Sequence, residues 1–211
     1  MFTFPQKNIQ GVAKPRSVNQ TDDIERAQHK KGVVDFVDPT KVVYQLGVKE
    51  GMHVVDLGAG SGAYTKVMAN FVGAVGQVYA VEVQKDLLQR LKTDMQKLGY
   101  NHITYIWGNI EKIGGTKIGD AEIDFVLISN VLFQVEDVEQ CLQEAFRILK
   151  KGGGVGVVEW SDSSNGMGPR PDALIARGTL LAKLHEAGFA YSKDFDAGSH
   201  HYGCLALKPK L

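Results

Sequence analysis

The sequence predicts an α/β fold with a doubly wound, mostly parallel sheet, and three observations lead to this prediction. Strand-like and helix-like segments alternate from residue 53 to residue 160, which is the pattern of βαβ units. The segment 123–130 is almost entirely apolar, as expected for a strand covered on both faces. The last two strand-like segments, 189–195 and 200–207, are joined too closely for a parallel crossover, so we expect them to be antiparallel.

The first elements are predicted from capping residues and apolar periodicity. A helix is expected at 38–47, because Asp38 suits the N-cap, Pro39 the first turn and Gly47 the position after the last turn. A buried strand, a helix, a β-branched strand and a helix with leucines at helical spacing follow in that order: 53–57, 63–73, 77–83 and 85–99.

The same alternation continues to the end of the chain. Two more strands, a helix, a fifth strand and a last helix precede the closing pair of strands: 102–108, 123–130, 138–153, 154–160 and 171–189. The helix at 138–153 is predicted because Val138, Leu142 and Ala145 fall on one side at the helical period. Together with the closing pair, these segments make seven predicted strands.

The chain is expected to form one domain at 38–211, preceded by an arm at 1–37. The arm is polar and contains few residues that could join a core. One interpretation is a lid over the active site that brings His29 above it. The competing interpretation is a disordered tail.

Composition limits the classes of function. The 211 residues are 44% hydrophobic, and 24 basic residues balance 24 acidic ones, so no global charge attracts nucleic acid or anionic lipid. Apolar runs are shorter than the roughly 18 residues of a membrane span, and the N-terminus does not resemble a signal peptide. Cys141 and Cys204 are expected to be buried thiols. We therefore expect a cytoplasmic protein.

The most informative motif is HVVDLGAGSGAYT, at residues 53–65. Gly58, Gly60 and Gly62 follow the first strand, where doubly wound sheets bind ligands, and glycines let the backbone approach a ligand closely. The loop also satisfies a loose dinucleotide fingerprint, and Glu82 lies 20 residues after Gly62, where a ribose-binding acid would fall. The glycines alone therefore leave the choice of cofactor open.

Asp56 discriminates between the possible cofactors. A dinucleotide places its pyrophosphate on this loop and on the next helix N-terminus, and a carboxylate two residues before the first glycine would repel that pyrophosphate. The carboxylate instead suits a ligand that carries positive charge. S-adenosylmethionine has an ammonium and a sulfonium, and Glu82 can accept hydrogen bonds from both ribose hydroxyls.

With these motifs, the sequence resembles the class I S-adenosylmethionine-dependent methyltransferases over about residues 38–160. The matching stretches are VVDLGAGSG, VYAVEV, WGNIEKI, IDFVLISNVLFQVED and RILKKGGGVGVVE. Among the subfamilies, it is most similar to small ubiquinone/menaquinone-biosynthesis-like methyltransferases. The resemblance implies a Rossmann-like seven-stranded sheet of order 3-2-1-4-5-7-6 with strand 7 antiparallel, to which the predicted closing pair conforms.

The resemblance also implies a set of cofactor-binding residues. The glycine loop would line the methionine portion near Asp56, Glu82 would hold the ribose, Val83 and Ile110 would contact the adenine, and Asn109 would bond to its edge. Ser129 and Asn130 would form the floor under the sulfonium. The loop residues are Gly58, Ala59, Gly60, Ser61 and Gly62.

Methyl transfer depends mainly on alignment of the nucleophile, the methyl group and the sulfur, so the sequence need not contain a catalytic dyad. Asn130 and Glu159 are the catalytic candidates, with Glu159 as a base or as an orienting group for the acceptor. The alternative for Glu159 is a structural carboxylate that accepts backbone N–H groups. Phe133, Gln134 and Trp160 are candidates for the acceptor pocket. No metal is predicted, because His200 and His201 would face opposite sides of a strand.

The main functional prediction is transfer of a methyl group to a small-molecule acceptor. An RNA or protein methyltransferase is the first alternative, although the neutral charge and limited length argue against nucleic acid. An NAD-dependent oxidoreductase is the second, and Asp56 argues against it. A non-catalytic module that binds the cofactor is a further alternative.

Overall fold

The computed structural model describes residues 37–163 and 168–210. Apart from Val37, the predicted arm and its His29 lie outside these residues, so the lid interpretation stays a prediction. The described residues belong to one unit of the chain, which spans Val34–Leu211.

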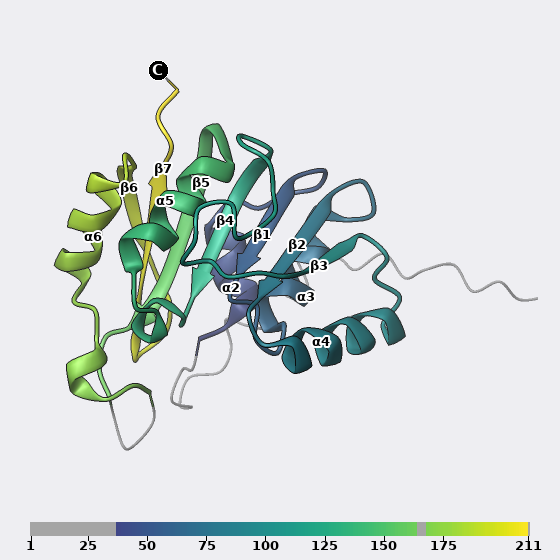
Figure 1. Cartoon of the computed structure of the whole chain (residues 1–211), viewed down its shortest axis with the longest axis horizontal. Helices are drawn as coiled ribbons and strands as arrows, with labels where there is room; N and C mark the ends of the chain where they lie inside the picture. Colours follow the sequence, from purple (N-terminus) through teal and green to yellow (C-terminus); the bar gives the residue numbers. More distant parts are fainter. Residues whose placement is uncertain (1–36, 164–167, 211) are drawn as a thin grey trace, which may run out of the picture. The chain divides into compact units, whose positions relative to one another are not determined.

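The sheet has seven strands in the order β3-β2-β1-β4-β5-β7-β6 (Figure 1). Strand β7 pairs antiparallel with β5 and β6, and the other neighbouring strands pair parallel. This confirms the predicted topology, including the reversed strand. The strands are β1 (His53–Leu57), β2 (Gln77–Glu82), β3 (Ile103–Trp107), β4 (Ile123–Ser129), β5 (Leu149–Trp160), β6 (Ala190–Phe195) and β7 (His201–Leu207).

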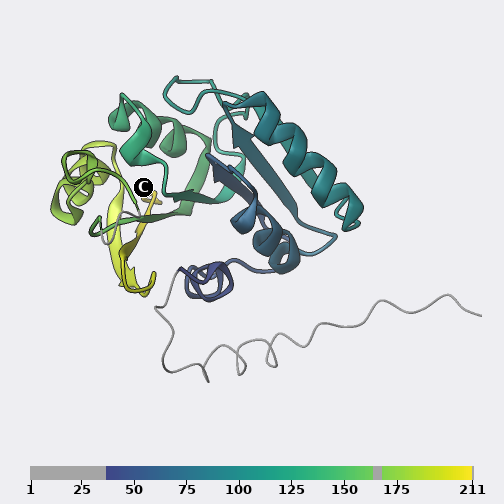
Figure 2. The same ribbon diagram turned by 90° about the horizontal axis from the view of Figure 1, so that it is seen from below.

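Helices cover both faces of this sheet, and Figure 2 shows α2 and α5 on opposite sides. One face packs against α2 (Pro39–Gln45), α3 (Ala63–Val72) and α4 (Lys85–Lys97). The other face packs against α5 (Val138–Ile148) and α6 (Arg177–Glu186). Alternation along β1 divides the two cores, because Val54 belongs to the first and Val55 to the second.

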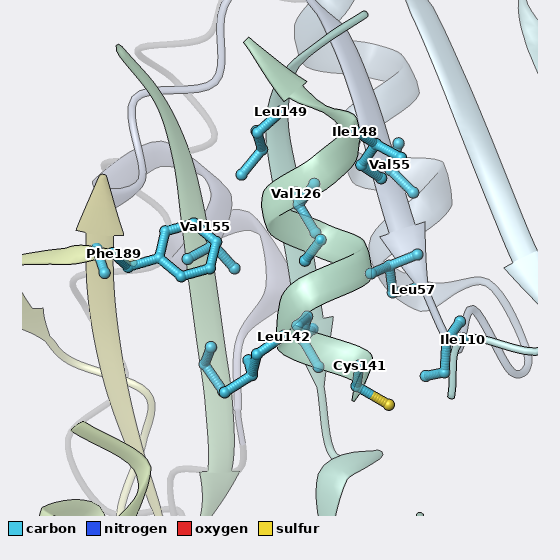
Figure 3. Close-up of a cluster of buried hydrophobic side chains, with 14 of the residues drawn as sticks. Val55, Leu57, Ile110, Val126, Cys141, Leu142, Ile148, Leu149, Val155 and Phe189 are labelled. Carbon is cyan, nitrogen blue, oxygen red and sulfur yellow. The ribbon is translucent and has the colours of Figure 1, made fainter. Parts of the chain in front are cut away.

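The core under α5 extends to the loop after β3, where a contact with the cofactor is predicted. Cys141 and Leu142 of α5 are fully buried there, and Ile110, which follows β3, joins the same cluster (Figure 3). The side chains that pack α5 on the sheet thus also help to fix the loop after β3.

Two predicted helices are wrong at their ends. The segment 138–153 is helical only to Ile148, and β5 begins at Leu149 instead of residue 154. The Lys208 ammonium donates to the carbonyls of Phe146 and Leu149 at 2.7 and 2.8 Å, which stabilises the end of α5. This contact comes from the far end of the chain, so local periodicity could not reveal it.

The segment 171–189 was predicted as one helix, but α6 occupies only its centre. A short 3₁₀ turn, η3, spans Pro171–Ala173, and α6 begins at Arg177 after an extended Ala176. The Tyr202 hydroxyl of β7 donates to the Ile175 carbonyl at 2.8 Å and holds this stretch in its non-helical form.

Within the described ranges, no helix combines the length and the apolar character that a bilayer span requires. Both cysteines are free and buried, as predicted.

Candidate functional site

A cavity of about 430 Å³ lies at the carboxyl ends of β1, β2 and β4. This is the position where doubly wound sheets bind ligands. The cavity brings together every residue predicted to contact the cofactor except Gly62. These residues are Asp56, Gly58, Ala59, Gly60, Ser61, Glu82, Val83, Asn109, Ile110, Ser129 and Asn130.

The three glycines of the loop have different roles. All have positive φ angles, which disfavour other residues. A Cβ on Gly58 would lie 2.7 Å from Val131 Cγ2, so this glycine allows the turn after β4 to pack on the loop. A Cβ on Gly60 would have only the Gly58 carbonyl, at 3.9 Å, within 4 Å. Gly60 thus presents bare backbone to the cavity.

Gly62 serves packing rather than the cavity. It is the N-cap of α3 with φ 85°, and a Cβ there would lie 2.0 Å from Leu91 Cδ1 on α4. The structure therefore places Gly62 between two helices, outside the cavity lining, and its predicted contact with the cofactor is not supported by this geometry.

Glu82 ends β2 with a buried carboxylate that is fixed by backbone groups. Its Oε2 accepts from the Gly60 N–H and its Oε1 from the Gln84 N–H, both at 2.9 Å. Each oxygen keeps a second lone pair, so the fixed carboxylate can still accept hydrogen bonds from a ligand.

Asp56 lies deeper, at 2% exposure, and its Oδ2 accepts from the Thr65 hydroxyl at 2.6 Å. Burial raises the pKa of Asp56 to about 6, the Thr65 bonds oppose this rise, and nearby Glu82 adds to it. A ligand cation in the cavity would favour the ionised form of Asp56.

The loop after β3 forms the opposite wall of the site. The Asn109 side-chain oxygen accepts from the Glu111 N–H at 2.8 Å, so part of its bonding capacity is used within the turn. Glu111, which also lines the cavity, accepts from the Glu136 and Asp137 N–H groups at 2.8 and 3.1 Å. Glu111 therefore ties this wall to the loop before α5.

The loop is held a second time, through α5. Glu144 is fully buried and accepts from the Gly114 N–H, the Thr116 N–H and the Thr116 hydroxyl. Arg147 forms an ion pair with it at 2.8 Å. Although burial alone would raise the pKa of Glu144, these bonds lower it to about 2.

The floor of the cavity is formed by the turn after β4. Asn130 has φ 54°, a left-handed conformation that asparagine tolerates better than most residues. Its side-chain oxygen is buried and has no hydrogen-bond partner among the described residues. Tyr64, from the first turn of α3, also lines the cavity near Ser129, and burial raises the pKa of its hydroxyl.

Glu159 was predicted either as a group at the reacting centre or as a structural carboxylate, and its contacts are those of the second alternative. It is 1% exposed at the end of β5 and is not among the cavity-lining residues. Its Oε1 accepts from the Val131 and Leu132 N–H groups at 3.0 and 2.7 Å. Burial raises the pKa of Glu159 to about 7, although these bonds oppose the rise.

Nine residues of the lining were not predicted from the sequence. Val81 is the penultimate residue of β2, and the others lie within about seven residues after the ends of β1 to β4, so a search of the whole loop after each strand would have found most of them. They are Ala63, Tyr64, Val81, Gln84, Leu87, Gly108, Glu111, Val131 and Val135, whereas Gln134, also in the lining, was predicted for the acceptor pocket.

Trp160, His185, His200 and His201 are not among the cavity-lining residues. The Trp160 ring packs against His201, with centroids 4.1 Å apart, and against Gly168. His200 bonds to Asp162 at 2.9 Å. Phe133, the other acceptor candidate, is not in the lining either. Among residues 37–163 and 168–210, no group of three or more potential metal ligands occurs.

Comparison with known proteins identifies this architecture. Residues 48–197 match a family described as "Methyltransferase domain". The chain belongs to the class I methyltransferases. The methyltransferase domain is 26% identical to a solved SAM-dependent methyltransferase from Aquifex aeolicus, with a TM-score of 0.76 over 82% of this chain and 90% of that one.

Curated relatives match parts of the methyltransferase domain. Human arsenite methyltransferase is 36% identical over 110 residues, which cover 49% of this chain and 29% of that protein. The ubiquinone/menaquinone biosynthesis C-methyltransferase UbiE of Hahella chejuensis is 32% identical over 148 residues, which cover 67% of this chain and 58% of that protein. The matches thus span less than two thirds of the length of these relatives.

Proposed function

We propose that this chain binds S-adenosyl-L-methionine in the cavity and transfers its methyl group to a small-molecule acceptor. The observation that supports this most directly is the charge of the lining. Among the described residues it contains Asp56, Glu82 and Glu111 but no lysine, arginine or histidine. Such a lining favours a ligand with cationic groups and disfavours a diphosphate.

The residues present fit this cofactor. Gly60 presents bare backbone, the Glu82 carboxylate is fixed with acceptor capacity to spare, and the buried Asn130 oxygen lacks a partner among the described residues. Glu82 would hold the ribose hydroxyls, and Val83 and Ile110 would contact the adenine. Asp56 would stabilise positive charge at the methionine end.

The chemistry needs little from the protein beyond positioning. The bound cofactor supplies an electrophilic methyl group with a neutral thioether as the leaving group. The protein aligns the nucleophile with that methyl group and excludes water, which can contribute on the order of 7–11 kcal/mol. Asn130 and Tyr64 are polar residues of the lining that could take part in this positioning.

The cysteines of the chain bear on whether its acceptor is arsenite, as in one of the relatives, or an organic molecule. Trivalent arsenic is a soft centre that binds thiolates. The chain has only two cysteines, both buried, and burial raises the pKa of each to about 12. Capture of arsenite by these thiols is therefore unfavourable, and we favour an uncharged or cationic organic acceptor.

The rival interpretations predict different ligands. An oxidoreductase requires a dinucleotide, whose diphosphate would face Asp56 and Glu82. An RNA methyltransferase requires a basic surface, which the neutral chain does not predict. A cytoplasmic location stays a prediction, compatible with the two free thiols.

Calorimetry with S-adenosylhomocysteine and NADH tests the proposal. S-adenosylhomocysteine should bind, and Glu82→Ala should weaken this binding at least tenfold, or about 1.4 kcal/mol. Binding of NADH without S-adenosylhomocysteine would favour the oxidoreductase. A tritiated-methyl transfer screen over quinols, small amines, RNA and protein would then identify the acceptor class.

A further inference from the structure

Glu159 is a buried acid without an evident catalytic contact. Its carboxylate is 1% exposed, does not line the cavity and forms no ion pair in the part of the chain that the structure describes. Burial of an unpaired carboxylate is unfavourable unless hydrogen bonds compensate for lost water. Its bonding partners therefore indicate what the side chain is for.

Two of those partners are consecutive backbone groups of one turn, and the backbone of Trp160, the next residue in the chain, is the third. The N–H groups of Val131 and Leu132 both donate to Glu159 Oε1, at 3.0 and 2.7 Å. The preceding N–H, that of Asn130, donates to the Val158 carbonyl at 2.9 Å. Three successive N–H groups of the turn after β4 are thus bound to the end of β5.

This turn shapes the cavity at two points. Asn130 adopts its left-handed conformation there, and its unpartnered side-chain oxygen belongs to a cavity-lining residue. Val131 packs against Gly58, where a single added Cβ would overlap it. Displacement of the turn would therefore move both the floor of the cavity and its contact with the glycine loop.

We propose that Glu159 is a positioning residue, which sets the cavity floor through the backbone N–H groups of Val131 and Leu132. This inference rests on the proposed function of the cavity. A carboxylate suits the task because it only accepts hydrogen bonds, and one oxygen satisfies both donors. A direct role as the base would instead require Glu159 to reach the acceptor, from which the turn separates it.

The groups around Glu159 are consistent with a positioning role. Tyr202 of β7 lies opposite it in the strand register, and its hydroxyl donates to Ile175 rather than to Glu159. Its neighbours along the two strands, Trp160 and His201, pack on each other. The side-chain groups next to Glu159 therefore have other partners, and its carboxylate is bound by the turn after β4.

Calorimetry of S-adenosylhomocysteine binding to the full-length chain tests the proposal. Glu159→Ala removes the acceptor, and Glu159→Asp keeps the charge but withdraws it by about 1.5 Å, one carbon–carbon bond. Both should weaken binding at least tenfold. Glu159→Gln keeps an acceptor oxygen and should stay within about threefold of the wild type. Glu136 is an exposed acid in the loop that follows β4. Glu136→Ala is the matched control and should bind S-adenosylhomocysteine like the wild type.

The possible outcomes separate the two proposals. If the wild type does not bind S-adenosylhomocysteine, the proposed function fails. If the wild type binds and Glu159→Ala and Glu159→Asp bind equally well, the positioning role is overturned while the function stands. An equal loss in Glu159→Gln, or in Glu136→Ala, would also overturn it, because the effect would then not depend on the acceptor oxygen at residue 159.

Nuclear magnetic resonance gives a readout that does not depend on binding. The amide shifts of Val131 and Leu132 should titrate with Glu159 in the ligand-free wild type and should lose this titration in Glu159→Gln, while both shifts stay near their wild-type values at acidic pH. If the two amides do not respond to pH in the wild type, or respond equally in Glu159→Gln, the proposed connection is wrong. This measurement remains decisive if Glu159→Ala does not fold.

Discussion

Asp56 connects the charge of the cavity to a measurable pH dependence. Burial raises the pKa of Asp56 from 3.8 to about 6, so in the ligand-free protein the carboxylate gains its charge between about pH 5 and 7. A ligand cation nearby interacts favourably only with the ionised form. Because binding favours the ionised state, affinity rises with pH through this range and then levels off.

We therefore expect S-adenosylmethionine to bind about tenfold more weakly at pH 5 than at pH 7.5, since about a tenth of Asp56 is ionised at the lower value. Calorimetry across this range measures the effect. Asp56→Asn keeps an acceptor for the Thr65 hydroxyl but cannot ionise, so its affinity should be low and nearly constant. A wild-type profile as flat as that of Asp56→Asn would show that this carboxylate does not govern binding.

At the scale of elements, the glycines of the loop differ in function: Gly62 is needed for packing, and Gly60 is expected to be needed for ligand binding. Gly62→Ala combines a positive φ with overlap of Leu91 and should destabilise the fold by about 2–4 kcal/mol. Gly47→Ala, with φ 75° and open space around its Cβ, isolates the backbone effect at about 1–2 kcal/mol. Urea denaturation measures both changes.

Gly60→Ala should destabilise the fold about as much as Gly47→Ala, but should in addition weaken cofactor binding at least tenfold. A Cβ at residue 60 has only the Gly58 carbonyl oxygen within 4 Å, and it would project into the cavity that Gly60 lines. Unchanged affinity in a folded Gly60→Ala protein would mean that the ligand does not approach this glycine.

Some helix boundaries depend on tertiary contacts, which local sequence signals do not reveal. Asp38, Pro39 and Gly47 correctly predict the short helix α2, and Asp38 accepts from the Thr40 N–H at 2.8 Å. The end of α5 and the start of α6 were wrong because Lys208 and Tyr202, on or just after the last strand, bond to backbone carbonyls there. Such bonds depend on tertiary contacts, which periodicity does not contain.

At the scale of the whole molecule, the sequence predicts the topology and most of the ligand loop because each depends on a local pattern. The alternation of elements predicts the parallel strands, and the short final connection predicts the reversed one. Of the side chains that support the site, only Glu159 was considered beforehand, as an alternative interpretation, and its backbone partners were not predicted. Glu111, Glu144 and Glu159 each bind backbone N–H groups at least 25 residues away in sequence, so only the fold brings these partners together.

Whether the arm is a lid or a tail must be tested on the whole chain, because residues 1–36 lie outside those that the structure describes. If the arm is a lid, it must move before the ligand leaves, so a chain of residues 37–211 should release S-adenosylhomocysteine several-fold faster than the full chain. Stopped-flow displacement measures this rate, and equal denaturation midpoints would show that both chains are equally folded. Equal release rates at equal stability would contradict the lid and favour a tail, because a segment that does not cover the cavity cannot delay the departure of its ligand.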